Sequence, residues 1–202
     1  MSVVAKIHAA ARRATMRDFL GMLALQEANL LENLVDAERA SGFLSARFNA
    51  EQFSRMNHDA CIIVAEHDDR IVGYACCADV EYSRQFPILA AMIATFDRHT
   101  YLGNPLIDSR AVIYGPVCVD RALRGRGIFR QLIRGIKVEL SGRFDVAVAF
   151  IAKVNTHSLT AHVDGLGMTT VGEFSLDGRN FWIIAFSIPA ADVACGVRPS
   201  ST

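Results

Sequence analysis

The sequence lacks the features that mark membrane proteins, metal-binding modules and disulfide-rich secreted proteins. No apolar run approaches the roughly 20 residues of a membrane-spanning helix, and the N-terminal residues are too weakly charged and apolar for a signal peptide. The five cysteines are odd in number and have no metal-ligand spacing, so we interpret them as buried reduced thiols. These absences predict a cytoplasmic protein that holds no metal ion and is neither exported nor inserted into a membrane.

The sequence also has no excess charge of either sign. Lys and Arg together number 21, as do Asp and Glu, so nothing directs the protein toward nucleic acid or an anionic membrane. Hydrophobic residues make up 51% of the 202 positions, enough for an ordinary globular core. We expect one domain over residues 1–189, a flexible tail over 190–202, and a small partner.

The first half of the chain predicts several helices and one hairpin. In chain order we expect a strand at 3–8, a helix opened by the capping pair Thr15 and Asp18, a helix near 30–40, a short helix capped by Asn49 and Gln52, a hairpin of strands 60–66 and 70–79, a helix over 84–97 and a loop at 103–105.

The second half alternates strands and helices. We expect a strand at 111–119, a helix at 127–140, a strand at 145–151, a helix at 156–166 and a last hairpin that turns at Asp177 and Gly178. The helix at 127–140 carries one apolar stripe, so it should pack on a sheet. The fold class is therefore α/β with a mixed sheet.

The connection from the strand at 111–119 to the next helix has the composition of an anion site. Gly125 and Gly127 allow the backbone to approach a ligand closely, and the first N–H groups of the following helix have no intrahelical acceptor. Arg124 and Arg126 add positive charge beside this turn. The segment is suited to a pyrophosphate, although a plain strand-to-helix turn with solvated arginines is the alternative.

A proline lies within the strand that leads to this turn. Pro116 cannot donate a ladder hydrogen bond, so Gly115-Pro116 implies a bulge or a splaying of the strand from its neighbour. A splay would expose the backbone groups of Val117 and Val119 to an extended, amide-containing ligand. An edge strand that tolerates a proline is the other interpretation. The phosphate turn a few residues later favours the splay.

A kinase or dehydrogenase phosphate site is disfavoured. The glycine turn lacks the Lys-Ser/Thr pair of a P-loop, and it lies after the midpoint of the chain. No acidic ribose partner follows at the position expected for a dinucleotide fold, although Asp145 comes near that distance.

Two stretches carry a resemblance to a known family. Val119-x-x-x-x-Arg124-Gly125-Arg126-Gly127-Ile128 resembles the acyl-CoA-binding motif Q/R-x-x-G-x-G/A of the GNAT acetyltransferase superfamily, with Phe129 in place of the last small residue. Asn155-x-x-Ser158-x-x-x-His162, followed by Gly167-Met168, is similar to the family's later N-x-x-A-x-x-x-Y segment with its Gly-Phe pair. The resemblance covers roughly residues 111 to 188.

The resemblance implies a GNAT-like splayed mixed β-sheet flanked by helices on both faces, with acyl-CoA between the splayed strands. It implies an N-acyltransferase that moves an acetyl group from acetyl-CoA to a primary amine by direct attack. A non-catalytic acyl-CoA-binding or regulatory module is the alternative. The implied cofactor-binding residues are Val117, Val119, Arg124, Gly125, Arg126, Gly127, Ile128, Phe129, Asn155 and Ser158.

The implied catalytic groups are the backbone N–H of Val119, for the oxyanion, and His162, as proton donor to the leaving thiolate. His162 has a second interpretation, a half-buried helix histidine that only bonds a neighbour. Asn155 is a good N-cap and, by resemblance, also contacts the pantetheine arm. Cys118 is interpreted as a packing residue rather than a nucleophile.

The acceptor is expected to be a small-molecule or peptide amine. Its pocket should lie beside the first two helices and the insertion at 82–105, with Tyr82, Phe86, His99 and Tyr101 as candidate lining residues. No base is singled out by spacing among Asp79, Glu81, Tyr114, Glu27 and Glu32. Apolar residues at 86–96 and in the final hairpin suggest a homodimer.

Overall fold

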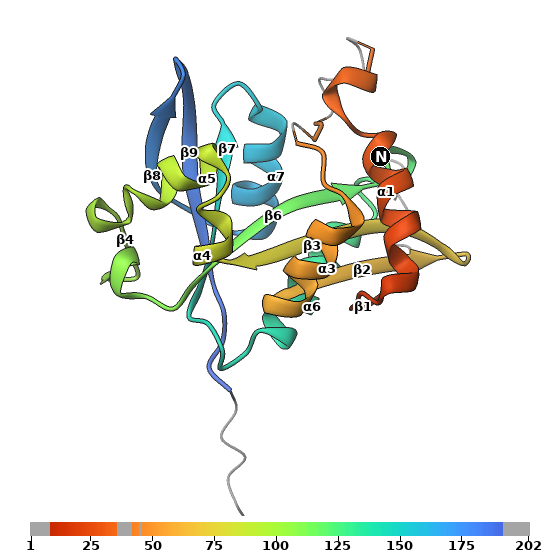
Figure 1. Cartoon of the computed structure of the whole chain (residues 1–202), viewed down its shortest axis with the longest axis horizontal. Helices are drawn as coiled ribbons and strands as arrows, with labels where there is room; N and C mark the ends of the chain where they lie inside the picture. Colours follow the sequence, from red (N-terminus) through yellow and green to blue (C-terminus); the bar gives the residue numbers. More distant parts are fainter. Residues whose placement is uncertain (1–8, 36–41, 45, 192–202) are drawn as a thin grey trace, which may run out of the picture.

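The computed structural model describes residues 9–35, 42–44 and 46–191, which form a β-sheet with helices on both faces (Figure 1). The strands are β1 (Ala10–Arg13), β2 (Cys61–His67), β3 (Arg70–Asp79), β4 (Thr100–Tyr101), β5 (Asn104–Pro105), β6 (Ala111–Val119), β7 (Val146–Ala152), β8 (Thr169–Leu176) and β9 (Arg179–Ser187). The helices are α1 (Phe19–Glu27), α3 (Ala50–Asp59), α4 (Val80–Ser83), α5 (Pro87–Ile93), α6 (Ile128–Glu139) and α7 (Thr156–Leu166), with 3-10 turns η1 (Met16–Asp18), η2 (Leu31–Asn33), η3 (Phe96–Arg98), η4 (Leu106–Asp108) and η5 (Arg121–Leu123).

The main sheet is mixed, as the sequence predicts. Its strands follow the order β1-β2-β3-β6-β7-β9-β8. The central pair β6 and β7 is parallel, and every other neighbouring pair is antiparallel. In Figure 1, β2, β3 and β6 run across the view, whereas β7, β8 and β9 rise toward the top, so the two halves of the sheet diverge.

The divergence begins inside β6, at the point that the proline indicates. Pairing between β6 and β7 ends at Ile113 opposite Val148. β6 continues beside β3 as far as Val119, while β7 continues beside β9. The Gly115-Pro116 peptide is cis. Ala75 pairs with Val117 and Cys77 pairs with Tyr114, so Gly115 and Pro116 of β6 lie opposite the single residue Cys76 of β3 and form a bulge. The predicted splay is therefore confirmed.

Three apolar clusters hold the helices on the sheet. One lies between the sheet and α6 with α7, and it includes the predicted stripe of Ile128, Leu132, Ile133, Ile136 and Leu140. The second lies on the opposite face, beneath α1 and α3. The third joins α5 and its neighbours to β7, β8 and β9. The helices thus cover both faces and leave the gap between β6 and β7 as the place for a site.

The insertion between β3 and β6 differs from the prediction. Instead of one helix over 84–97, the chain ends the short helix α4 at Ser83 and then forms α5 and η3. Pro87 has no N–H to donate and therefore begins α5 as a new helix. The predicted loop at 103–105 is part of a small ladder of β4 with β5, turned by Leu102 and Gly103 at positive φ. Met92, Ile93 and Phe96 are buried in the third cluster, and the homodimer stays a prediction.

The capping predictions are confirmed. Thr15 with Asp18 forms a capping box that opens η1 and leads into α1, and Asn49 with Gln52 forms another that opens α3. The turn of the final hairpin is at Asp177 and Gly178, both at positive φ. The helix expected near 30–40 is wrong over its described part, where Leu30 pairs with Leu44 and the chain forms only the 3-10 turn η2 before Leu34 becomes extended. The strand expected at 3–8, residues 36–40 and the tail beyond residue 191 lie outside the described residues.

Candidate active site

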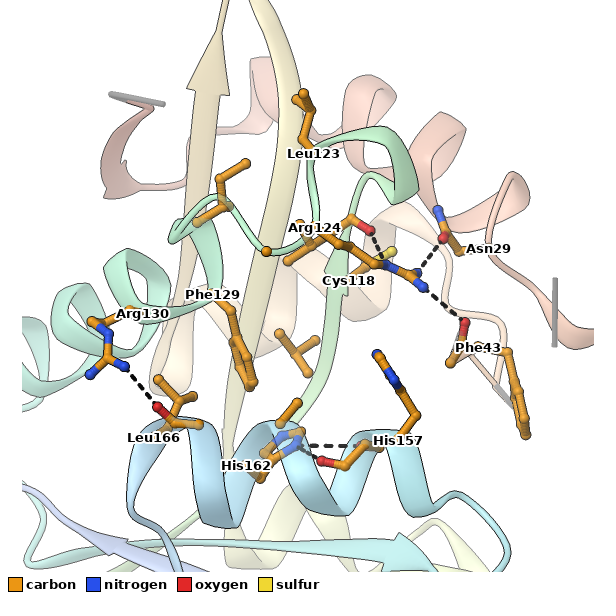
Figure 2. Close-up of a pocket in the computed structure, with 18 of the residues that line it drawn as sticks. Asn29, Phe43, Cys118, Leu123, Arg124, Phe129, Arg130, His157, His162 and Leu166 are labelled. Atoms are coloured by element: carbon orange, nitrogen blue, oxygen red, sulfur yellow. Dashed lines mark hydrogen bonds between the residues drawn. The ribbon is translucent and has the colours of Figure 1, made fainter. Parts of the chain in front are cut away.

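A cleft of about 500 Å³ opens where β6 and β7 part (Figure 2). The end of β6, the turn into α6, and α7 form three of its sides, and residues 42–44, which we call the wall segment, form the fourth. Of the described residues implied by the resemblance, those on the cleft are Val117, Val119, Arg124, Gly125, Gly127, Ile128, Phe129, Asn155, Ser158 and His162. The sequence-predicted residues therefore converge, apart from Arg126, which lies off the cleft wall.

The backbone of β6 directs polar groups toward this cleft, although one of them, the Val119 carbonyl, accepts a hydrogen bond from Arg124. The Asp120 N–H donates to the Val72 carbonyl of β3 at 2.8 Å. Because residues of an antiparallel strand alternate in the direction of their hydrogen bonds, Cys118 also faces β3, whereas Val117 and Val119 direct their backbone groups away from it. On that side β7 has already departed. An extended ligand that carries amides can pair with this edge.

The turn after β6 has the geometry of a phosphate cradle. Gly125 and Gly127 have φ of 75° and 90°, and a Cβ built on either glycine would meet no atom within 4 Å. α6 begins directly afterwards, at Ile128, so its first N–H groups face the cleft without intrahelical acceptors. Only glycine adopts this backbone at low cost. The turn can therefore bring several N–H donors against an anion.

Arg124 differs from the expectation that it adds charge beside the phosphates, whereas the same expectation for Arg126 stays a prediction. The guanidinium of Arg124 donates hydrogen bonds to the backbone carbonyls of Val119 and Gly42 and to the side-chain oxygen of Asn29. Figure 2 shows the bond to Asn29. Burial lowers its pKa. Arg130 lines the cleft and donates to the Gly165 carbonyl at 2.7 Å, so it bridges α6 and α7.

His162 is buried at the base of the cleft, with 5% of its surface exposed. Its Nδ1–H donates to the Ser158 carbonyl at 2.7 Å, one turn earlier in α7. Nε2 lies 3.4 Å from the Tyr114 hydroxyl and accepts from it. Burial lowers the pKa of His162 to about 4. The ring is neutral at neutral pH, which fits the second interpretation of this residue better than a resting imidazolium.

Phe129 fills the space that a small residue would leave open. Its ring packs edge-on against His162, with 4.8 Å between centroids. Figure 2 shows the ring reaching from α6 toward α7. The departure from the family's small residue therefore has a structural consequence, because the side chain narrows the floor of the cleft.

Asn155 caps α7, as predicted, because its Oδ1 accepts from the Ser158 N–H at 3.1 Å. Both residues line the cleft. A contact of Asn155 with a pantetheine arm stays a prediction.

Cys118 has the surroundings of a packing residue. Its side chain belongs to the cluster beneath α1 and α3, with Sγ 3.9 Å from the Leu25 carbonyl. Burial raises the pKa of this thiol to about 12. A thiolate nucleophile is therefore not available at neutral pH.

The candidate general bases all lie off the cleft wall. Asp79 caps α4, Glu81 pairs with Arg84, and Tyr114 is buried against His162. Glu27 and Glu32 both pair with Arg47.

The aromatic residues of the insertion serve in packing. Tyr82 and Phe86 pack on each other, and Phe86 also packs on Phe48. His99 lies so close to Gly172 that a Cβ there would be 2.3 Å from its ring. The Tyr101 hydroxyl is 3.0 Å from Ser187 Oγ. These residues do not line the described cleft.

Several cleft residues could not be found from the sequence. Asn29, the wall segment and His157 carry no motif, and they reach the cleft only through tertiary contacts. Arg130 lies in the helix recognised as amphipathic, but its bridge to α7 has no local signal.

The described part of the chain shows neither a metal-binding cluster nor a membrane-spanning helix. Within residues 9–35, 42–44 and 46–191, no group of three or more His, Cys, Asp or Glu side chains is placed to hold a metal ion. None of the helices described has the length and apolar character that crossing a membrane requires.

The family of the protein follows from its sequence match. Residues 27–162 match the family model described as the acetyltransferase (GNAT) family. Because the match covers more than half of the chain, the protein belongs to the GNAT acetyltransferase family. Acetyl transfer from acetyl-CoA is the general activity of this family. No match was found among curated protein sequences.

Solved structures share the fold at low sequence identity. An N-acetyltransferase from Staphylococcus aureus Mu50 is 16% identical, covers 90% of this chain and 99% of its own, and gives a TM-score of 0.56. A ribosomal-protein-alanine N-acetyltransferase from Brucella melitensis is 20% identical, with coverages of 88% and 99% and a TM-score of 0.56. YncA from Salmonella typhimurium, solved with its cofactor acetyl-CoA, is 20% identical, with coverages of 94% and 100% and a TM-score of 0.55.

Proposed function

We propose that the protein transfers an acetyl group from acetyl-CoA to a primary amine of a small molecule or peptide, by direct attack of the amine on the thioester. One observation carries the proposal: the open backbone edge of β6 leads straight into the glycine turn within a single cleft. An amide-bearing arm that ends in a pyrophosphate needs these two features side by side, in this order.

The residues of the cleft fit acetyl-CoA. The open space over Gly125 and Gly127 would receive the pyrophosphate, with the N–H groups that begin α6 as donors. The backbone of Val117 and the N–H of Val119 would pair with the pantetheine amides, because the Val119 carbonyl already accepts from Arg124. Asn155 would approach the same arm from α7. Acetyl-CoA supplies the activated acetyl group.

Either Val117 or Val119 would stabilise the oxyanion through its backbone N–H, because both point into the gap between β6 and β7. Val117 lies nearer along the strand to Tyr114, which contacts His162. If His162 lies beside the leaving sulfur, the N–H of Val117 is better placed than the N–H of Val119 to stabilise the oxyanion. This assignment refines the expectation that Val119 holds the oxyanion.

The proton balance needs no external acid. The attacking amine loses one proton as its nitrogen forms the amide bond, and the departing CoA sulfur gains one proton as the carbon–sulfur bond breaks. We place His162 beside the sulfur as a neutral imidazole, whose Nδ1–H is held by Ser158. In this role Nε2 takes the proton that the amine releases while its hydrogen bond from Tyr114 opens, and the short-lived imidazolium gives that proton to the departing sulfur. The ring does not store the proton, because its pKa is about 4.

A second function is favoured by one observation, the absence of an aspartate or glutamate among the residues that line the described cleft. A cleft with no carboxylate base also fits a non-catalytic module that binds acyl-CoA.

Thiol release distinguishes the two functions. The protein is mixed with acetyl-CoA and, in turn, a polyamine, an aminoglycoside, free amino acids and a peptide with a free N-terminus. Transfer predicts thiol release that depends on one of these amines and falls at least about 100-fold in Gly127→Glu. Gly103→Glu is the matched control, since Gly103 also has positive φ and open space but lies on the β4–β5 turn. Tight binding of acetyl-CoA with no amine-dependent release would instead establish the binding module.

A further inference from the structure

The guanidinium of Arg124 joins three parts of the chain that are far apart in the sequence. Its Nε donates to the Val119 carbonyl at 3.1 Å, and one terminal nitrogen donates to the Gly42 carbonyl at 3.3 Å. The other terminal nitrogen donates to Asn29 Oδ1 at 2.9 Å. Figure 2 shows this side chain pointing toward Asn29 and away from the floor of the cleft. All of these acceptors are neutral oxygens, so Arg124 directs its charge into the protein.

Asn29 extends the connection to the wall segment. It is 2% exposed, and its Nδ2 donates to the Leu25 carbonyl at 2.8 Å. Its own backbone carbonyl accepts from the Leu44 N–H at 2.9 Å, and the Leu44 carbonyl accepts from Leu31 at 2.9 Å. Arg124 thus reaches the wall segment twice, directly at Gly42 and through Asn29 at Leu44.

The wall segment crosses from Arg124 to α7. A Cβ built on Gly42 would lie 3.9 Å from an Arg124 nitrogen and 3.4 Å from Cδ2 of His157. His157 is in the first turn of α7, so this segment spans the open end of the gap between β6 and α7. The segment lines the same cleft as the glycine turn.

A lysine cannot replace this arrangement. Hydrogen bonds from a charged donor are stronger than neutral ones, and the planar guanidinium directs its donors along fixed, separate directions. Lysine keeps the positive charge but has a single nitrogen at the end of a flexible chain. Substitution by lysine therefore separates the effect of charge from the effect of the three-way connection.

We propose that Arg124 is a positioning residue, which fixes the wall segment and the last peptide of β6 around the acyl-CoA arm, and that it does not bind phosphate through its charge. The inference rests on the proposed function, because the wall segment matters for catalysis only if the cleft holds acyl-CoA. It predicts that the two elements of the cleft, the glycine turn and the wall segment, are coupled through this one side chain.

The test compares Arg124→Lys with Arg124→Gln, and uses Arg134→Lys, an exposed site on α6, as the matched control. Hydrogen exchange at the Leu44 amide reports on the wall segment, and calorimetry with desulfo-CoA reports on the phosphate site. We expect exchange at Leu44 to rise at least about 10-fold in both Arg124 variants. We expect the Kd for desulfo-CoA to change by less than about 10-fold, and equally in both, because the glycine turn is retained.

The coupling between the glycine turn and the wall segment can also be measured by a change that a simple loss of stability would not produce. In the parent protein, desulfo-CoA should slow exchange at Leu44. In both Arg124 variants, this ligand-dependent protection should disappear although desulfo-CoA still binds. The opposite pattern would overturn the proposal: Arg124→Lys binding like the parent, Arg124→Gln losing affinity, and Leu44 exchange unchanged in both.

A second variant guards against misfolding of the first two. Gly42→Ala leaves Arg124 in place but disfavours the positive φ of 95° at Gly42, so it should also speed exchange at Leu44. Normal exchange in Gly42→Ala, together with normal exchange in either folded Arg124 variant, would contradict the proposal. If the parent fails to bind desulfo-CoA, the proposed function is wrong, while the exchange measured without ligand still decides the role of Arg124.

Discussion

The imidazole of His162 packs edge-on against the ring of Phe129, with 4.8 Å between ring centroids, and so forms the floor of the cleft. Phe129 comes from the first turn of α6 and His162 from α7, so the contact joins the two helices that enclose the cleft. This contact contributes to the burial that keeps the histidine neutral.

Removal of the Phe129 ring should raise the pKa of His162. Burial is the main cause of the pKa of about 4, and Phe129→Ala admits water to one face of the imidazole. We expect the pKa to move upward, toward the ordinary value of about 6.5. An NMR titration of the histidine Hε1 signals in the parent and in Phe129→Ala measures it. An unchanged His162 titration would show that the ring does not shield it.

The same histidine predicts a fall in stability toward acid pH. The folded-state pKa of about 4 lies below the unfolded value of about 6.5, so the unfolded chain binds more protons between these pH values. Stability contributed by the neutral ring is complete above about pH 6.5 and is lost as pH falls to about 4, by about 3 kcal/mol. Urea unfolding at several pH values measures the slope. His162→Gln should remove that part of the slope. Equal slopes in the parent and in His162→Gln would contradict the account.

Removal of the Tyr74 hydroxyl should not lower the free energy of unfolding. Tyr74 is 0% exposed, and its hydroxyl has no hydrogen-bond partner within the described residues. An unsatisfied buried hydroxyl is unfavourable, so Tyr74→Phe should leave the free energy of unfolding unchanged or raise it by about 1 kcal/mol. Tyr101→Phe, which loses the bond to Ser187, should lower it by about 1 kcal/mol. Denaturant unfolding checks both, and a clear loss in Tyr74→Phe would reveal a partner.

Two helix glycines should respond in opposite directions to alanine. A Cβ on Gly135 in α6 would lie 2.7 Å from Cγ2 of the buried Ile63, so Gly135→Ala should cost about 1–3 kcal/mol. Gly165 in α7 has room, with its nearest neighbour at 3.8 Å, so Gly165→Ala should gain up to about 1 kcal/mol from helix propensity. Thermal unfolding compares the pair. Equal changes in stability in the two variants would mean that α6 packs less closely on β2 than the structure shows.

The sequence was most informative where structure is set locally. Gly115-Pro116 indicated the splay because a proline cannot take part in a ladder, and the glycines after β6 indicated a turn that only they adopt easily. The cap at Asn155 and the apolar stripe of α6 were visible for the same reason. Pro87 is also a local signal, because proline favours the first position of a helix. The apolar spacing over 84–97 nevertheless favours a single helix across it, and that prediction is wrong.

The rest of the site depends on contacts between distant residues. Nothing in the sequence near Arg124 indicates that Asn29 and Gly42 would accept its hydrogen bonds, so its charge was expected to face phosphate. The neutral state of His162 likewise depends on Tyr114 and Phe129, which come from other elements. Residue types and spacing gave the location of the cleft, but the direction of each side chain required the fold.

The central claim is that the glycine turn and the open edge of β6 bind acetyl-CoA. Calorimetric titration of the purified protein with acetyl-CoA and with desulfo-CoA, repeated on Gly127→Glu and on the control Gly103→Glu, tests it most directly. The account predicts binding by the parent and by Gly103→Glu, and a loss of at least about 100-fold in Gly127→Glu, because its side chain and charge occupy the phosphate position. Absence of binding by the parent, or equal binding by Gly127→Glu, would contradict it.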